Sequence, residues 1–365
     1  MRPSRTAIRQ GRRNLWPALL LLLLTAAAPL SAQELSVPDR ALLQAAREGN
    51  AELAAFALER GADPAAALPE QGLTPLHHAA DQGHIEILGL LIDAGAPLEA
   101  REARYGHTPL LLAVRSARRA AVTTLLEAGA DTEARDRQGN TPLITAAFDP
   151  RRLPVLAELL SRGAAPAAAA EDGLTSLLAA ASRGNEGAVQ LLLDAGAAVE
   201  TRQSEGYTAL LLAALGGHTD VVRRLLQAGA ELEAQAARGD TALGAAAAAA
   251  QVDTVLALLE AGADPQRPSR DGLPPLHRAV RGGAVGAVLA LLTEGADPDA
   301  IDAEKGNTAL MLAANQGRPD LVRILLSQGA RTDVVAKDGW TALEAAEMVG
   351  DDKSLALLRA AGAKE

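Results

Sequence analysis

The histidines are the first residues to consider for chemistry, because imidazole can bind metals and transfer protons near neutral pH. His77 and Asp81 lie four residues apart, so they would share one face of a helix, and His84 follows closely. A hydrolytic metal site needs three protein ligands and hydrogen-bonding partners that orient them. No other segment adds a ligand to this trio, so a metal half-site is only an alternative, and we predict no metal and no cofactor. The six histidines are His77, His78, His84, His107, His218 and His277.

Motifs of other enzyme classes are absent from the sequence. It contains no G-x-S-x-G nucleophile elbow, no H-E-x-x-H zinc motif and no glycine-rich phosphate loop. It also contains no cysteine, which excludes disulfides, thiolate catalysis and cysteine-based zinc sites. Carboxylate pairs such as Glu171-Asp172 fall where we expect exposed loop tips. The sequence therefore predicts a protein that is not an enzyme.

These residues belong to a unit that recurs along the chain. In its clearest copy, Thr74 can cap a helix that starts at Pro75 and ends at Gly83, and a second apolar helix runs to Gly95. Neither helix is long enough to be stable alone in water, so the copies must pack on one another. The threonine recurs in steps of 33 or 34 residues at Thr74, Thr108, Thr141, Thr175, Thr208, Thr241, Thr308 and Thr341, and Pro274 replaces it once.

The unit resembles the ankyrin repeat. The segment from Thr74 to Ala79 matches the T-P-L-H-x-A pattern of that family, and the step matches its period of about 33 residues. The resemblance covers residues 38–363. It implies an all-α solenoid of about ten helix–turn–helix units with β-hairpin-like loops, and structural roles for His77, His84, His218 and His277. A Gly-Ala pair closes each repeat, so the repeats of the array 33–365 should end near residues 62, 96, 130, 164, 197, 230, 263, 296, 330 and 363.

Two repeats depart from the pattern. The fourth has one extra residue between Phe148 and Pro154, and it lacks the usual Gly-His junction between its helices. The seventh has a run of alanines from Ala245 to Ala250 and lacks the Gly-His as well. Loops accept insertions readily, so these departures are either ordinary drift or, in the fourth repeat, a bend or a protrusion that a partner recognises.

Residues 1–32 have the pattern of a secretory signal peptide. Five arginines and no acid precede an apolar run from Leu15 to Leu30, and small residues precede a cleavage point near Ala32. The general secretory route and, because of the Arg12-Arg13 pair, the twin-arginine route both remain open. We expect a periplasmic or secreted protein. The alternative is an uncleaved membrane anchor, although the run 15–30 is shorter than a typical span.

Charge narrows the choice of partners. The whole chain has a formal net charge of −10, and without the five leader arginines it carries 30 basic and 45 acidic residues, a net charge of −15. No repeat supplies the basic face that nucleic-acid binding requires. An anionic membrane surface is disfavoured for the same reason once the signal peptide has been removed. We therefore expect a monomer that binds a protein.

The resemblance also indicates where a partner would bind. Ankyrin arrays usually meet partners at the loop tips and the adjoining first helices. Only five aromatic residues follow the leader, and all except Phe56 fall in these positions. Exposed aromatic side chains are common binding hot spots, although such positions can also simply tolerate rings. Rings at Tyr105, Phe148 and Tyr207 should share a footprint of roughly 30 Å that Trp340 is too distant to join. The predicted partner-binding residues are Tyr105, His107, Arg115, Asn140, Phe148, Tyr207, Leu215 and Trp340.

The sequence thus predicts an exported, non-catalytic scaffold or adaptor that binds a protein on its concave loop and first-helix face. One alternative is a tether that the uncleaved N-terminal segment anchors in a membrane. The other is an enzyme, or a binder of a small molecule or metal.

Overall fold

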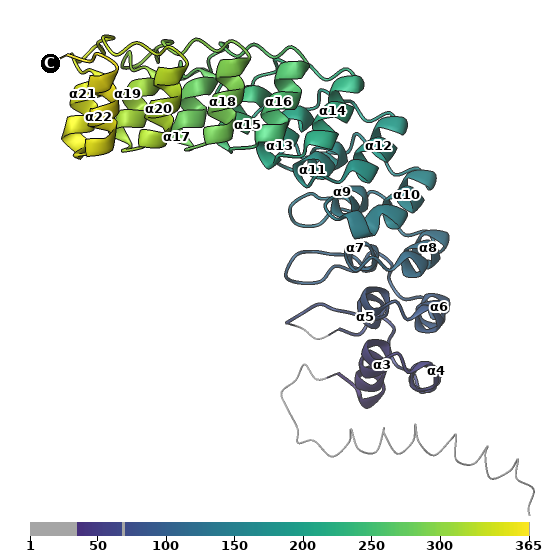
Figure 1. Cartoon of the computed structure of the whole chain (residues 1–365). Helices are drawn as coiled ribbons and strands as arrows, with labels where there is room; N and C mark the ends of the chain where they lie inside the picture. The colour runs from purple at the N-terminus through teal and green to yellow at the C-terminus, as the bar shows by residue number, and fades with distance from the viewer. Residues whose placement is uncertain (1–34, 68–69, 365) are drawn as a thin grey trace, which may run out of the picture. The chain divides into compact units, whose positions relative to one another are not determined.

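The computed structural model describes residues 35–67 and 70–364. These residues form ten pairs of antiparallel α-helices (Figure 1), and the predicted all-α solenoid of ankyrin type is confirmed. The first helices of the pairs are α3 (Val37–Glu48), α5 (Pro75–Gln82), α7 (Pro109–Arg115), α9 (Pro142–Ala147), α11 (Ser176–Ser182), α13 (Ala209–Gly216), α15 (Ala242–Ala248), α17 (Pro275–Arg281), α19 (Ala309–Asn315) and α21 (Ala342–Val349). The second helices are α4 (Ala51–Glu59), α6 (Ile85–Asp93), α8 (Arg119–Glu127), α10 (Leu153–Ser161), α12 (Glu186–Asp194), α14 (Thr219–Gln227), α16 (Val252–Glu260), α18 (Val285–Thr293), α20 (Pro319–Ser327) and α22 (Asp352–Ala360).

The chain divides into two compact units, one that ends at Glu171 and one that begins at Asp172. The first holds the described helices α3 to α10, and the second holds α11 to α22. Within each unit, first helices pack against the first helices of neighbouring repeats, and second helices form a row of their own (Figure 1).

Local chemistry defines each first helix. In α5, the Thr74 side chain accepts a hydrogen bond from the backbone of His77, and Pro75 occupies the first turn, where its missing N–H costs nothing. Gly83 ends the helix with φ = 80°, a left-handed conformation that favours glycine. The same threonine cap recurs along the array. There are two exceptions: Ser36 caps α3, and Pro274 provides no side-chain cap for α17.

The core consists of small and branched aliphatic residues. In α6 the buried side chains are Ile87, Leu88 and Leu91, whereas in α15 five of the six buried side chains from Ala242 to Ala247 are alanine or glycine. None of the five aromatic residues in the described chain is fully buried. Short alanine-rich helices can approach closely, which lets adjacent repeats bury a continuous core without rings.

In the described residues, the loops between repeats form tight hairpin-like tips without regular strands. In the third repeat, the Glu102 N–H donates to the His107 carbonyl at 3.0 Å, and the Gly106 N–H donates to the Glu102 carbonyl at 3.1 Å. Successive tips are joined as well, since the Ala103 N–H donates to the Gln71 carbonyl at 2.8 Å. Backbone bonds of this kind recur in later repeats and hold the tips in a row within each unit.

Three repeats lack glycine at the junction between their two helices, and their backbones differ there. In the fourth repeat, a 3-10 helix η1 (Pro150–Arg152) fills the junction, and Pro154 lies in the first turn of α10. In the third and seventh repeats, Ala117 and Ala250 take φ values of 55° and 58°, where most repeats have glycine. A left-handed alanine costs about 1–2 kcal/mol, so these junctions are locally strained.

The predicted signal peptide, residues 1–32, lies outside the described residues. Between residues 35 and 364, apart from 68–69, no helix has the length and apolar character that crossing a bilayer requires.

Candidate partner-binding surface

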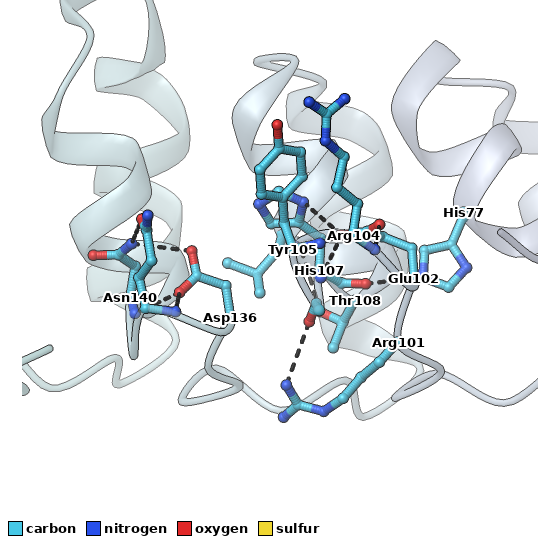
Figure 2. Close-up of polar contacts among 12 residues, drawn as sticks. His77, Arg101, Glu102, Arg104, Tyr105, His107, Thr108, Asp136 and Asn140 are labelled. Carbon is cyan, nitrogen blue, oxygen red and sulfur yellow. Dashed lines mark hydrogen bonds and ion pairs between the residues drawn. The ribbon is translucent and has the colours of Figure 1, made fainter. Parts of the chain in front are cut away.

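The tip of the third repeat presents an aromatic side chain on a rigid support (Figure 2). Tyr105 is 42% exposed, the Arg104 guanidinium lies 4.9 Å from its ring centroid, and the His107 ring centroid lies 5.3 Å away. The Glu102 carboxylate accepts backbone hydrogen bonds from Arg104 at 2.6 Å, Tyr105 at 2.6 Å and His107 at 3.2 Å. In the described part of the chain, the Tyr105 hydroxyl has no hydrogen-bond partner. The ring is therefore held in place while its polar end remains available.

Glu102 and His107 form the base of this tip. Burial alone would raise the pKa of Glu102, but the three amide hydrogen bonds outweigh it and the net pKa is lowered. Burial, with the nearby charge of Arg115, lowers the pKa of His107, whose Nδ1 lies 3.3 Å from the Glu102 Oε1. His107 is only 9% exposed. Its main contribution here is to support Tyr105, and contact of its own side chain with a partner stays a prediction.

Hydrogen bonds also order the tip of the fourth repeat and join it to that of the third. Arg101 donates to the carbonyl of Gly106 and to that of Arg135 in the following repeat. The half-buried Asn140 donates from Nδ2 to the Asp136 carboxylate at 3.0 Å (Figure 2). A surface that is already ordered loses little conformational entropy when it binds. This order favours recognition by the tips of the third and fourth repeats.

Phe148 and Arg115 lie at the ends of adjacent first helices in the same compact unit. Phe148 is half-buried at the end of α9, and Arg115 is exposed at the end of α7. Arg152 ties the two helices together, because its Nε donates to the Arg115 carbonyl at 3.0 Å and its Nη1 to the Thr145 carbonyl at 2.8 Å. The extra residue of the fourth repeat thus belongs to an ordered junction beside both predicted residues.

The other predicted residues, Tyr207, Leu215 and Trp340, belong to the second compact unit. Tyr207 is half-buried, and burial followed by the nearby carboxylate of Asp240 raises its pKa. Leu215 is 44% exposed at the end of α13. A footprint shared by Tyr105, Phe148 and Tyr207 would need both compact units, so it stays a prediction.

Trp340 belongs to a surface that also contains leucine and methionine side chains. It is 41% exposed and lines a hollow of about 310 Å³ together with Met311, Leu312 and Met348. Met348 is 63% exposed, although methionine is usually buried. Met348 is not among the predicted binding residues, but a methionine late in a first helix is a signal in the sequence that could have indicated this surface. Flexible thioethers beside a ring are typical of adaptable binding surfaces.

The geometry does not support the alternative of a metal half-site at His77. This ring is fully buried, its Nδ1 lies 2.8 Å from the Thr74 Oγ1, and its Nε2 lies 3.0 Å from the His107 carbonyl. Both ring nitrogens are therefore occupied within the fold. In the described part of the chain, no three histidine, aspartate or glutamate side chains are grouped so that they could hold a metal ion.

Comparison with known families agrees with this geometry. The family described as ankyrin repeats in three copies matches residues 42–136, 143–236, 177–269, 229–302 and 276–364. The chain belongs to the ankyrin-repeat family. Ankyrin repeats are generally protein–protein interaction modules, and proteins of this family are typically non-catalytic binding scaffolds. A search of curated proteins found no match.

Proposed function

We propose that this ankyrin-repeat protein is an exported, non-catalytic adaptor that binds a protein partner through its loop tips and first helices. The observation that carries the proposal is the tip of the third repeat, where Tyr105 is exposed and held by Arg104, His107 and the Glu102 carboxylate. Tyrosine is enriched among binding hot spots, and it loses little rotamer entropy when its support is already rigid.

The surroundings of Tyr105 indicate the chemistry of the partner. Its free hydroxyl can donate to a carbonyl or carboxylate, and the exposed Arg104 and Arg115 add positive charge to a chain that is acidic overall. A partner surface that contributes hydrogen-bond acceptors and an apolar cleft for the ring would complement this tip.

Site-specific photo-crosslinking in the native cell tests the binding proposal. A benzophenone amino acid at Tyr105 should capture a defined protein, whereas the same group at Ala120, which is exposed on the second helix α8, should not. Equal capture at both positions, or no captured protein at Tyr105, would contradict the assignment of this face.

Export is the second part of the proposal, and it depends on residues 1–32. The intact mass of the protein from its native cells should correspond to a chain that begins near Gln33, found outside the cytoplasm. A full-length chain in the membrane fraction would favour the tether instead. A full-length cytoplasmic chain would overturn export while leaving the binding proposal intact.

A further inference from the structure

A hollow of about 700 Å³ lies between the first helices of the first two repeats, α3 and α5. These helices are neighbours in the first compact unit (Figure 1). Arg40, Leu43 and Arg47 line the hollow from α3, His78 lines it from α5, and Leu35 lines it from the segment before α3. The volume lies within the range of about 300–1,000 Å³ that is usual for ligand sites.

Three side chains that line this hollow carry donors without an acceptor in the described part of the chain. The Arg40 Nε is buried without a hydrogen-bond partner. In the same described residues, the side chains of Arg47 and His78 make no ion pair and no hydrogen bond. The one acid that lines the hollow, Glu48, accepts from the Gln44 amide at 3.1 Å. A buried donor without a partner is unfavourable, so this end of the hollow holds more hydrogen-bond donors than acceptors.

Electrostatics identifies the missing group as an anion. Burial, and then the positive charge of Arg47, lower the pKa of His78 to about 4, although Asp81 acts in the opposite direction. His78 is therefore neutral at pH 7, while Arg40 and Arg47 remain charged. Two guanidinium groups beside one engaged carboxylate favour a carboxylate ligand. The leucine side chains of the hollow favour an apolar group attached to it.

We propose that this hollow binds the C-terminal carboxylate of a polypeptide that ends in an aliphatic residue. The carboxylate lies against Arg40 and Arg47, and the terminal side chain lies against Leu35 and Leu43. This assignment rests on the proposed function, because it names the part of a protein partner that the first two repeats would recognise.

Calorimetric titration of the full chain with three matched peptides tests the ligand class. Acetyl-Ala-Ala-Leu with a free carboxylate should bind at least about tenfold more tightly than the same peptide with a C-terminal amide, since a charge-assisted hydrogen bond contributes about 1.5–3 kcal/mol. An amidated peptide in which glutamate precedes the leucine should bind no better than the first amide. Equal binding of the acid and the simple amide, or no binding of the acid, would overturn the site. Equal binding of the acid and the glutamate peptide would overturn the assignment to a chain terminus.

Two matched variants test the location. Arg47→Gln should weaken binding of the free acid about tenfold. Arg323→Gln, which removes the same charge from an exposed position on the second helix α20, should leave the affinity unchanged. Both arginines are exposed, so thermal unfolding should be the same for the two variants and the wild type. Full affinity in Arg47→Gln, or equal losses in both variants, would overturn the proposal.

A spectroscopic measurement separates direct contact from remote effects. The free acid should raise the pKa of His78, seen in the NMR shift of its ring protons, because an anion offsets the charge of Arg47. His84 lies outside the hollow and should not respond. An unchanged His78 pKa on a saturated protein would place the peptide elsewhere. Because these tests do not involve Tyr105, the crosslinking result and the peptide result can fail independently.

Discussion

The second and eighth repeats carry the same Pro-Leu-His segment but complete it differently. His77 and His277 are both fully buried, and each reaches the loop of the next repeat, at 3.0 Å from the His107 carbonyl and 2.8 Å from the Asn307 carbonyl. In the second repeat, the Thr74 N–H also donates to the His77 Nδ1 at 3.1 Å. In the eighth repeat, proline replaces the threonine, and the His277 Nδ1 has no partner in the described structure.

The comparison shows that the threonine has two roles. It caps the helix, and its N–H defines the tautomer of the histidine, because an Nδ1 that accepts leaves the proton on Nε2 to donate to the next repeat. Pro274 has neither an N–H nor a hydroxyl, so both roles are lost together. The eighth repeat thus keeps the bond between repeats but leaves a buried acceptor unsatisfied, which costs about 1–3 kcal/mol.

The largest effect should come from deleting each histidine. His77→Ala should destabilise its compact unit by about 2–4 kcal/mol, because it leaves the Thr74 N–H buried without a partner, removes one of the two hydrogen bonds to the His107 carbonyl and opens a cavity. His277→Ala should cost about 1 kcal/mol less, since only the Asn307 carbonyl loses a partner. Urea unfolding of the two variants measures the difference. Equal losses would show that Thr74 adds nothing to the histidine.

Acidification should weaken the second repeat next. Burial lowers the pKa of His77 and of His277, and it lowers that of His78 to about 4, below the ordinary value of 6.5. The unfolded chain therefore binds more protons below pH 6.5, so stability falls as the pH drops from 6.5 towards 4 and is fully present above that range. The substitution His78→Asn should reduce the loss of stability between pH 6.5 and pH 4 by about 1–2 kcal/mol, a figure that allows for solvent screening.

Urea unfolding at pH 7 and pH 4.5 measures this change. Between pH 7 and pH 4.5, the variant should lose less stability than the wild type. A wild-type protein that unfolds at the same urea concentration at both pH values would contradict the prediction.

Restoring the threonine should reverse part of the difference between the repeats. Pro274→Thr gives His277 a donor and α17 a side-chain cap, and we expect a net gain of about 1 kcal/mol after the lost rigidity of proline is counted. The matched change Thr74→Ala should cost about 1–2 kcal/mol. Thermal unfolding of both variants checks the pair. A destabilised Pro274→Thr would mean that the orphaned nitrogen is not what distinguishes the eighth repeat.

The smallest effect concerns the junctions between helices. Ala250→Gly should stabilise the seventh repeat by about 0.5–1 kcal/mol, because glycine relieves the positive φ at the cost of some backbone entropy. Gly350→Ala should cost about 1 kcal/mol from its φ of 74° alone, since an added Cβ would meet no atom within 4 Å. Hydrogen exchange of the neighbouring helices reports both changes. The two substitutions should change stability in opposite directions. A change in the same direction would show that Ala250 is not strained.

The sequence by itself determined the fold, because each helix depends on signals within a few residues. Thr74, Pro75 and Gly83 specify where α5 starts and ends, and the regular step of about 33 residues brings each repeat against the next. Even the irregular junction before Pro154 was visible as an extra residue. Contacts between equivalent positions of neighbouring repeats follow from the period.

The chemistry of single side chains was decided only by the tertiary structure. Nothing in the sequence indicated that His107 would lie on the Glu102 carboxylate, or that Arg104 would lie over Tyr105, because several acceptors and rings compete within each loop. Likewise, Arg40 and His78 are far apart in the sequence and form one hollow only when α3 packs against α5. The side chains that remain without partners there then define what the hollow can bind.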